Sequence, residues 1–357
     1  MPARELAARV LLVLGSLAVG FALLEAGCRL AGSPHELLEA LHLADRPAAG
    51  ERVCMHVHDS ALGWVLVPGC TSADFNVAAD GYRVTPPLSA SPLVAAPVVL
   101  ATGSSFVEGD DVKDRETWPA FLQDRLGRRV VNAGVDGFSL DQTVLRTEQL
   151  VPALHPQVVV ASFTPDDVHR TELRVAWTKN KPYFTLQEDG GQEDGGLALH
   201  NVPVPAETRE WASLRPLSRL LGWSMLVDTV VRRLGLQEHW YVDAVAASPD
   251  GAGDEISCRL MRRLAEIGVP VLMVAQYGRL TWDADDVDRQ ADHRRSQHVL
   301  ACAARAGLAT LDTFDPVGRA LTAEGKDALY RGVHHTPQGN RLVATAIAEA
   351  IEKLPAH

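Results

Sequence analysis

The stretch Val98-Val99-Leu100-Ala101-Thr102-Gly103-Ser104-Ser105 decides the fold. Its first four residues form a continuous apolar run, which is typical of a strand that is covered on both faces of a parallel sheet. The glycine and the two serines that follow indicate a turn at the carboxyl end of that strand. Open α/β sheets bind ligands at this edge, so we expect Ser105 to stand where chemistry takes place.

Four further apolar runs repeat this pattern, at residues 129–132, 157–161, 269–275 and 308–311. Helical patterns lie between and after them, at residues 117–126, 140–151 and 256–267, in a long stretch that ends at Gly307, and in a stripe over residues 342–354. Short buried strands that alternate with amphipathic helices are typical of a parallel sheet with helices on both faces. The sequence therefore predicts an α/β three-layer sandwich.

Residues 177–253 interrupt this rhythm with an acidic glycine-rich patch, a proline-rich run and a hydrophobic helix near residues 217–234. We interpret them as an insertion. It either shapes a substrate cleft at the carboxyl edge of the sheet or is a surface excursion with no functional contact. The expected organisation is residues 1–8 in the cytoplasm, 9–30 as a membrane anchor, 31–94 as a linker and lead-in, and 95–357 as the α/β domain.

The composition excludes one class of partner. The chain has 357 residues, of which 46% are apolar and 22% charged, so it is long enough to bury the core of one large domain. Its 34 Lys and Arg and 45 Asp and Glu give a net charge of −11. Because this charge would repel a phosphate backbone, we do not expect nucleic acid as a partner.

The N-terminus carries an apolar run at residues 10–24, preceded by Arg4 and Arg9. The run is shorter than the roughly 20 residues that span a bilayer. A helix over residues 7–30 is long enough if Arg9, Glu25 and Arg29 reach the interfaces. We favour a single-pass signal anchor that leaves the domain outside the cytoplasm. A cleaved signal peptide, a soluble helix and a lipidated Cys28 remain open alternatives.

The five cysteines would meet an oxidising compartment if the domain lies outside the cytoplasm. Cys54 and Cys70 could then pair, whereas Cys258 and Cys302 fall on expected helices and are interpreted as small buried hydrophobes. A zinc set is the alternative for the first group, but its spacing matches no common structural site, so no metal is expected. That set would be Cys54, His56, His58 and Cys70.

Three more segments carry candidate reactive groups. Asn132-Ala133-Gly134-Val135-Asp136-Gly137 follows the second strand, and Phe163-Thr164-Pro165-Asp166-Asp167 follows the third. Far downstream, Gly332-Val333-His334-His335-Thr336-Pro337-Gln338-Gly339-Asn340 precedes the last helix. Since parallel strands end at the same edge, we expect these segments to meet Ser105.

With these segments, the sequence resembles the SGNH or GDSL-like hydrolases over about residues 59–354. These are serine esterases and acyl transferases with a flavodoxin-like sheet. Leu62-Gly63-Trp64, Pro68-Gly69 and Gly81-Tyr82-Arg83 look like the lead-in of membrane-anchored bacterial members. The resemblance implies that Ser105 is the nucleophile, that His334 is the base, and that the amides of Ser105 and Gly134 bind the oxyanion.

Two positions of the family blocks are altered. Ser104 stands where the family has a structural aspartate, and Asp166 stands where it has the asparagine that donates to the oxyanion. An ionised Asp166 would repel that charge. A buried Asp166 with a raised pKa could instead donate a hydrogen bond as a neutral acid.

The acid of a catalytic triad is missing from its usual place two or three residues before the histidine. Gly332 stands two residues and Arg331 three residues before His334. Asp327, Asp312 or a backbone carbonyl are the expected substitutes. The neighbouring pair Asp110-Asp111 is interpreted as a solvated acidic turn rather than a metal site.

We therefore expect an extracytoplasmic serine esterase or O-acyltransferase that acts through a Ser105–His334 dyad. Its expected partners are an acyl ester, with glycans and cell-envelope components as the candidate carriers, and the membrane that holds the N-terminal helix. No cofactor is expected. The alternative is a catalytically degenerate SGNH-like module that binds carbohydrate or serves in assembly, since a fold does not imply a function.

Overall fold

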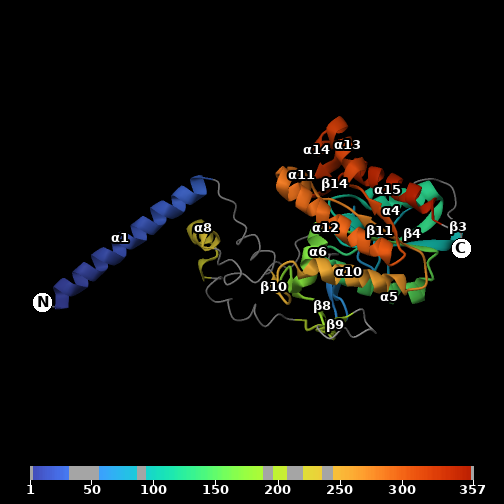
Figure 1. Ribbon diagram of the computed structural model, residues 1–357. Helices are drawn as coiled ribbons and strands as arrows, with labels where there is room; N and C mark the ends of the chain where they lie inside the picture. The colour runs from blue at the N-terminus through green and yellow to red at the C-terminus, as the bar shows by residue number, and fades with distance from the viewer. Residues whose placement is uncertain are drawn as a thin grey trace. The chain divides into compact units, whose positions relative to one another are not determined.

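The computed structural model describes residues 3–31, 56–86, 94–187, 196–206, 220–234 and 244–354 (Figure 1). The chain divides into two compact units. One combines Met1–Ala49 with Glu207–Val245, and the other combines Gly50–Ala206 with Ala246–His357. The second unit holds the sheet and every candidate reactive residue, and it is called the sheet unit below.

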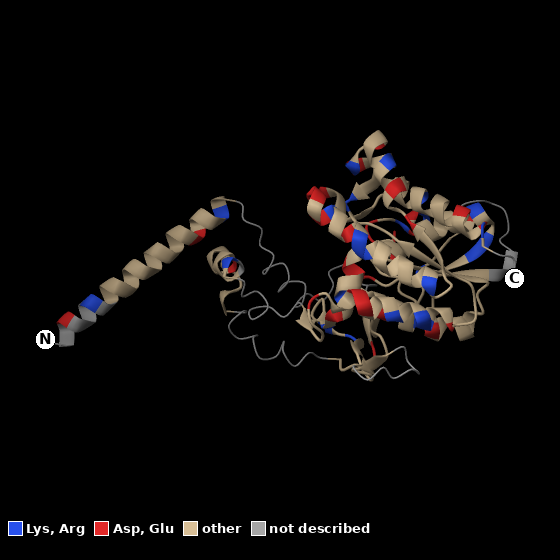
Figure 2. Cartoon of the chain, in the orientation of Figure 1, with Lys and Arg blue, Asp and Glu red and all other residues tan. Residues whose placement is uncertain are grey.

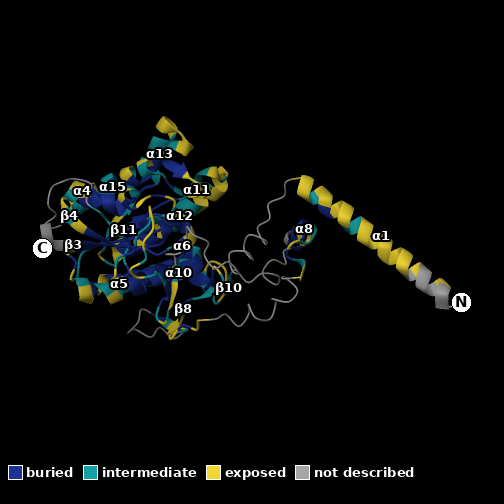
Figure 3. Cartoon of the chain, turned by 180° about the vertical axis from the view of Figure 1, so that it is seen from behind, coloured by how far each residue is buried: buried dark blue, intermediate teal, exposed yellow. Residues whose placement is uncertain are grey.

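The first unit contains the helices α1 (Ala3–Leu30) and α8 (Met225–Arg233). Residues Leu11–Leu30 of α1 are long and apolar enough to cross a membrane, by length and composition only. A signal sequence near an N-terminus meets the same criterion. Most of the described part of α1 is exposed (Figure 3), and its exposed residues include large apolar ones such as Leu11, Leu12 and Leu23. The predicted apolar helix is confirmed.

The sheet unit is built on five parallel strands. Their order across the sheet is β12-β11-β5-β3-β4. Counted along the chain and read from the β4 edge, this is second, first, third, fourth and fifth, which is the flavodoxin-like order. The predicted sheet is thus confirmed, with the strands β3 (Val94–Thr102), β4 (Arg128–Asn132), β5 (Val158–Phe163), β11 (Val271–Ala275) and β12 (Ala309–Asp312).

The sheet has a separate apolar core on each face, because successive side chains of a strand point to opposite faces. Val99 and Ala101 belong to one core, and Leu100 belongs to the other. Helices α4 (Trp118–Leu126) and α15 (Pro337–Ile351) cover the first face, and α5 (Leu140–Leu154), α10 (Ala252–Ala265) and α12 (Asp286–Arg305) cover the second (Figure 1). The predicted three-layer sandwich is confirmed, and the charged residues gather on the outer sides of its helices (Figure 2).

Local sequence signals set the helix ends. The Thr117 side chain accepts a hydrogen bond from the Ala120 amide at 3.2 Å and caps α4. Gly127 ends the same helix in the left-handed conformation, with a φ of 61°, which costs little at a residue without a Cβ. The Thr336 side chain caps α15 in the same way, by accepting from the Gly339 amide at 3.2 Å.

Shorter elements surround the sandwich. They are the strands β1 (Val57–Asp59), β2 (Gly63–Val65), β6 (Leu173–Ala176), β7 (Lys179–Asn180), β8 (Tyr183–Leu186), β9 (Leu197–His200), β10 (Val245–Ala246), β13 (Tyr330–Arg331) and β14 (His334–His335). The short helices are α3 (Ser105–Glu108), η1 (Asp114–Glu116), α6 (Pro165–His169), η2 (Arg170–Glu172), α11 (Arg279–Asp283), α13 (Phe314–Glu324) and α14 (Lys326–Leu329). The residues interpreted as an insertion include β7, β8 and β9 in the sheet unit and α8 in the first unit.

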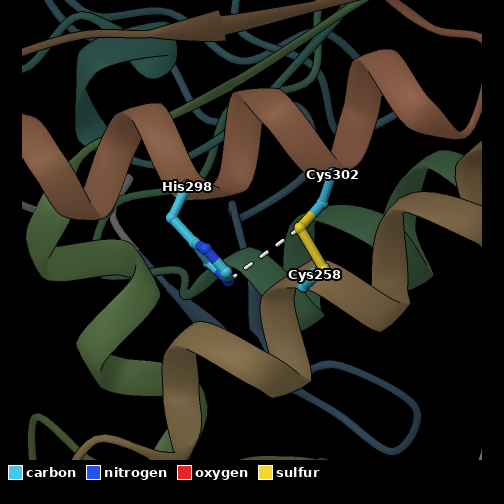
Figure 4. A group of neighbouring side chains, drawn as sticks. All are labelled: Cys258, His298 and Cys302. Carbon is cyan, nitrogen blue, oxygen red and sulfur yellow. Dashed lines mark hydrogen bonds between the residues drawn. A yellow bond between two sulfur atoms is a disulfide. The ribbon is translucent and has the colours of Figure 1, made fainter.

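Cys258 and Cys302 form a disulfide that joins α10 to α12, with their Cα atoms 5.2 Å apart (Figure 4). The interpretation of these residues as separate small hydrophobes was wrong, because the two helices pack side by side on one face of the sheet. Cys70 is also disulfide-bonded, and Cys54, its expected partner, lies outside the described residues. Cys28 is a free thiol.

His335, the neighbour of His334, is buried in the hairpin of β13 and β14 and is 3% exposed. Its ring lies 4.9 Å from that of Tyr330 and 5.3 Å from that of Phe106. Neither ring nitrogen has a hydrogen-bond partner among the described residues. Burial, and then the charge of His334, lower the pKa of His335 to about 3. The ring is therefore neutral in the folded protein.

We expect His335→Phe to make the folded protein less sensitive to acid. An unfolded histidine has a pKa of about 6.5, so the neutral ring contributes its full stability above that pH and loses it as the pH falls toward 3. For each pH unit of acidification, the free energy of unfolding of the variant should fall by up to about 1.4 kcal/mol less than that of the parent chain. Chemical denaturation of the full chain in detergent between pH 6.5 and 4 measures this difference.

His155→Asn is the matched control, because His155 is exposed and has a left-handed φ of 44° that asparagine tolerates. His56, whose pKa burial also lowers to about 3, is present in all three proteins and contributes a common slope. Equal slopes for the parent chain and His335→Phe would show that His335 takes up no proton in this range.

Candidate active site

Ser105 is the first residue of α3, in the turn that follows β3. The Ser104 carbonyl accepts the amides of Val107 and Glu108 and so begins the short helix. The Ser104 hydroxyl donates to Asp167 Oδ2 at 2.9 Å, which ties the turn to α6. Ser105 is 8% exposed, so the turn holds it at the surface of the sheet's carboxyl edge with little freedom.

His334 comes from β14, at the far end of the chain, and reaches Ser105. Its Nε2 lies 2.9 Å from Ser105 Oγ. The ring of Phe106 lies 5.2 Å from the imidazole and limits its movement. This distance is within the reach that a general base needs to take a proton from a hydroxyl.

Asp111 supplies a carboxylate on the other side of the imidazole. Its Oδ2 lies 3.0 Å from His334 Nδ1, and Asp110 Oδ2 lies 3.9 Å from the same nitrogen. If Nδ1 donates to Asp111, Nε2 is free to accept the Ser105 hydroxyl. The contacts therefore form a Ser-His-Asp series in which the acid follows the serine by six residues. The pair Asp110-Asp111 is half exposed, as expected for a solvated turn, yet it faces the histidine.

Arg83 holds the loop that carries Asp111. This guanidinium is 1% exposed. It donates to the Glu108 carbonyl at 2.9 Å and to the Val112 carbonyl at 2.6 Å, and Nε donates to Asp114 Oδ1 at 3.0 Å. Buried hydrogen bonds to charged groups are the stronger ones in proteins. Arg83 therefore fixes both ends of the segment that places Asp111 beside His334.

Asp327 and Asp312, the expected substitutes for the acid, lie elsewhere. Asp327 pairs with Arg279 at 2.7 Å. Asp312 accepts from the Tyr277 hydroxyl at 2.9 Å and lies 3.0 Å from His293 Nε2. Neither contacts His334 in the part of the chain that the structure describes.

Gly134 lies directly against α3. A Cβ at this position would lie 2.2 Å from the Glu108 amide nitrogen, so only glycine lets the loop after β4 approach the helix. The Gly134 amide donates to Asn132 Oδ1 at 3.1 Å, and Asn132 Nδ2 donates to the Glu108 carbonyl at 3.1 Å. An oxyanion would have to displace Asn132 Oδ1 to use the Gly134 amide.

Asp166 is exposed, and its carboxylate pairs with Arg170. The buried carboxyl is its neighbour Asp167, which accepts from the Thr164 amide at 2.8 Å and also pairs with Arg170. Burial raises the pKa of Asp167 to about 7, against the lowering effect of the Thr164 and Ser104 hydrogen bonds. The raised pKa that was considered for Asp166 therefore occurs one residue later.

Two more carboxyls surround the reactive residues. Glu108 accepts a hydrogen bond from the Asp136 amide, and burial, with help from Asp136 and Asp110, raises its pKa well above the usual value. Burial and Asp110 also raise the pKa of Asp136, although Lys179, His334 and Arg170 oppose the shift. Sequence reasoning did not identify Asp136 or Glu108, whose positions depend on the packing of α3 against Gly134.

Three groups of side chains have the spacing of metal ligands among the described residues. The first is Asp110, Asp111 and His334, whose imidazole already bonds Ser105. In the second, Figure 4 shows His298 pointing toward Cys258 and Cys302, but these two sulfur atoms are bonded to each other and offer no thiolate. Arg305 Nη2 also lies 2.9 Å from Cys302 Sγ and would repel a cation. The third group is His169, Glu172 and Asp250.

Comparisons with known proteins agree with this fold. Residues 236–357 match the family model described as SGNH hydrolase-like domain, acetyltransferase AlgX, a region that contains His334 but not Ser105. No curated protein matches the chain.

Similar solved structures include an α/β hydrolase, LAE5, from the metagenome of Lake Arreo, Spain, at 14% identity over 74% of this chain and 98% of that chain, with a TM-score of 0.43. A catalytic mutant of an acetylxylan esterase from Geobacillus stearothermophilus is 16% identical over 75% of this chain and 100% of that chain, with a TM-score of 0.41. A member of the lipolytic protein G-D-S-L family from Veillonella parvula is 14% identical over 72% and 100%, with a TM-score of 0.38.

The SGNH hydrolase-like family model thus matches the C-terminal third of the chain, and the five strands have the flavodoxin-like order that the resemblance to this family implied.

Proposed function

We propose that the chain is a serine esterase or O-acyltransferase that acts on acyl esters outside the cytoplasm. One observation carries this proposal: Ser105 Oγ and Asp111 Oδ2 lie 2.9 Å and 3.0 Å from opposite nitrogens of His334. A hydroxyl, an imidazole and a carboxylate in this series form the arrangement that activates serine for acyl transfer on several unrelated folds.

The chemistry follows from these contacts. Ser105 Oγ attacks the carbonyl carbon of an ester while His334 Nε2 takes the hydroxyl proton, and Asp111 holds the imidazolium that forms. His334 then gives this proton to the leaving alcohol, and an acyl ester remains on Ser105. Water or a second alcohol, deprotonated by His334, attacks the acyl ester and regenerates the serine. The Ser105 amide is the first of α3, and the first amides of a helix have no acceptor within it, so it can donate to the oxyanion.

The family model supports a small acyl group, because its description names an acetyltransferase. The reactive residues lie near the surface, with the His334 side chain 13% exposed and that of Asp111 44% exposed. A site of this kind can accept an ester on a large molecule, such as an acylated glycan. We therefore propose an acylated glycan or cell-envelope ester as the donor or product, with water or a sugar hydroxyl as the acceptor.

The location outside the cytoplasm is supported by two features. The apolar helix α1 carries Arg9 at its beginning, and a basic flank favours the cytoplasmic side. The disulfide between Cys258 and Cys302 and the one that includes Cys70 are of a kind that persists in oxidising compartments.

Ser105→Ala should reduce hydrolysis of a p-nitrophenyl acetate ester by about 10⁴-fold or more, because no other atom replaces the nucleophile. Ser104→Ala should retain most of the activity, since the Ser104 hydroxyl bonds Asp167 rather than His334. Initial rates, together with labelling by a fluorophosphonate probe, measure both effects. If the parent chain neither turns over the ester nor takes up the probe, the degenerate binding module is the better interpretation.

Asp111→Asn should lower kcat/KM by about 10² to 10⁴-fold, the range expected when a positioned acid is lost from the base. Asp327→Asn and Asp312→Asn are the controls, because these carboxylates bond other residues and should leave kcat/KM unchanged. Asp110→Asn tests the more distant carboxylate and should cost less than Asp111→Asn. An active Asp111→Asn beside an inactive Asp327→Asn would contradict the assignment.

An alkaline phosphatase fused after His357 should be active, because its fold needs disulfides that persist only outside the cytoplasm and α1 is proposed to leave the sheet unit there. Mass spectrometry of the membrane fraction should find peptides from α1, which a cleaved signal would have lost. Activity of a reporter that works only in the cytoplasm, fused at the same position after His357, would contradict the proposed orientation.

A further inference from the structure

We propose that residues 220–234 lie in the lipid interface of the bilayer that α1 spans, with one stripe of α8 against the lipid. This inference rests on the proposed membrane insertion of α1. Both helices belong to the first unit, in which α8 lies beside the C-terminal half of α1 (Figure 1).

Glu25 joins the two helices. It lies within the apolar stretch Leu11–Leu30, where an acidic side chain is costly unless its charge is compensated. Its carboxylate accepts the Ser224 hydroxyl at 2.7 Å, and the amides of Met225 and Leu226 at 3.1 and 3.0 Å. The amides of Met225 and Leu226 stand at the start of α8, where backbone N–H groups have no acceptor within the helix. Glu25 is thus the cap that fixes the beginning of α8 on the side of α1.

Trp223 makes a second contact with α1. Its ring lies 6.2 Å from that of Phe21 in an edge arrangement, and its carbonyl accepts from Arg29 at 3.0 Å. Arg29 also pairs with Glu25 at 2.8 Å. Phe21 lies three residues, or about 4.5 Å at the rise of an α-helix, before Leu24, where the continuous apolar run of residues 10–24 ends. Trp223 therefore lies near one end of this run, at the level where tryptophan is enriched in membranes.

The outer side of this segment is apolar and uncovered. Val230 and Leu234 are four residues apart, at the spacing of one helical stripe, and are 46% and 64% exposed. Trp223, in the turn before α8, is 49% exposed. Met225 and Val231 are 9% and 8% exposed and face the protein. The segment thus has an inner apolar side that is already buried and an outer one that lacks a partner among the residues that the structure describes.

Lipid is the occupant that fits this outer stripe. The neighbouring surface of α1 is also apolar and exposed, as at Leu23 and Leu24, and a bilayer around α1 would cover both surfaces at once. Arg233 at the end of α8 is exposed and can reach lipid headgroups. A short amphipathic helix with an interfacial tryptophan is the form in which proteins lie along a membrane surface. The insertion therefore contains a second membrane contact.

Quenching by lipid measures this position in the full chain. The Val230→Cys variant, made in a Cys28→Ser background, is labelled with an environment-sensitive fluorophore. It is then reconstituted in phosphatidylcholine and phosphatidylglycerol vesicles whose spin-labelled lipid quenches the fluorescence. Leu17→Cys in α1 reports the span itself, and Arg294→Cys, at an exposed position of α12, is the control outside lipid. We expect strong quenching at positions 17 and 230 and little at position 294.

The outcomes separate the two proposals. Strong quenching at position 17 with only background quenching at position 230 would overturn the interfacial placement and leave the anchor intact. Background quenching at both positions would overturn the anchor as well. Glu25→Ala removes the cap, so it should lower the quenching at position 230 while that at position 17 persists. Equal quenching at position 230 with and without Glu25 would contradict the role of this carboxylate.

Discussion

The hydrogen bond between Ser105 Oγ and His334 Nε2 joins two segments that are 229 residues apart in sequence. It forms because β3 ends at the same edge of the sheet where the chain enters α15. The two segments meet through Phe106, whose ring contacts both His334 and His335. Buried His335 packs against the rings of Phe106 and Tyr330 and so holds the hairpin in place. The reactive pair thus depends on the parallel sheet, which brings distant loops together without a direct chain connection.

The packing around α3 also determines where Asp111 lies. Gly134 lets the loop after β4 lie against Glu108, and Arg83 binds the carbonyls on both sides of the Asp110-Asp111 turn. Asp111 itself has a left-handed φ of 64°, a conformation that costs free energy in most residues and less in aspartate. The buried guanidinium compensates for this cost by fixing the loop. The position of the acid is therefore a result of tertiary contacts.

These contacts explain what the sequence could and could not predict. The strands, the place of Ser105 and the place of His334 follow from local patterns, namely apolar runs, turn residues and a helix start. Asp111 was interpreted as part of a solvated turn because nothing local indicates that Arg83 folds the turn back toward the histidine. The disulfide between Cys258 and Cys302 was missed for the same reason, since it depends on the packing of α10 against α12.

The shifted acid also accounts for the residues before His334. Gly332 has a φ of 56°, and a Cβ there would lie 3.5 Å from Asp111 Oδ2. An acidic side chain at this position would bring a second negative charge against Asp111 and would strain the turn. Arg331, paired across the hairpin with His334, is exposed, and water screens its charge from the imidazole. Since Asp111, in the loop after Ser105, supplies the carboxylate beside His334, the hairpin needs no acidic side chain of its own, and glycine at position 332 leaves room for Asp111.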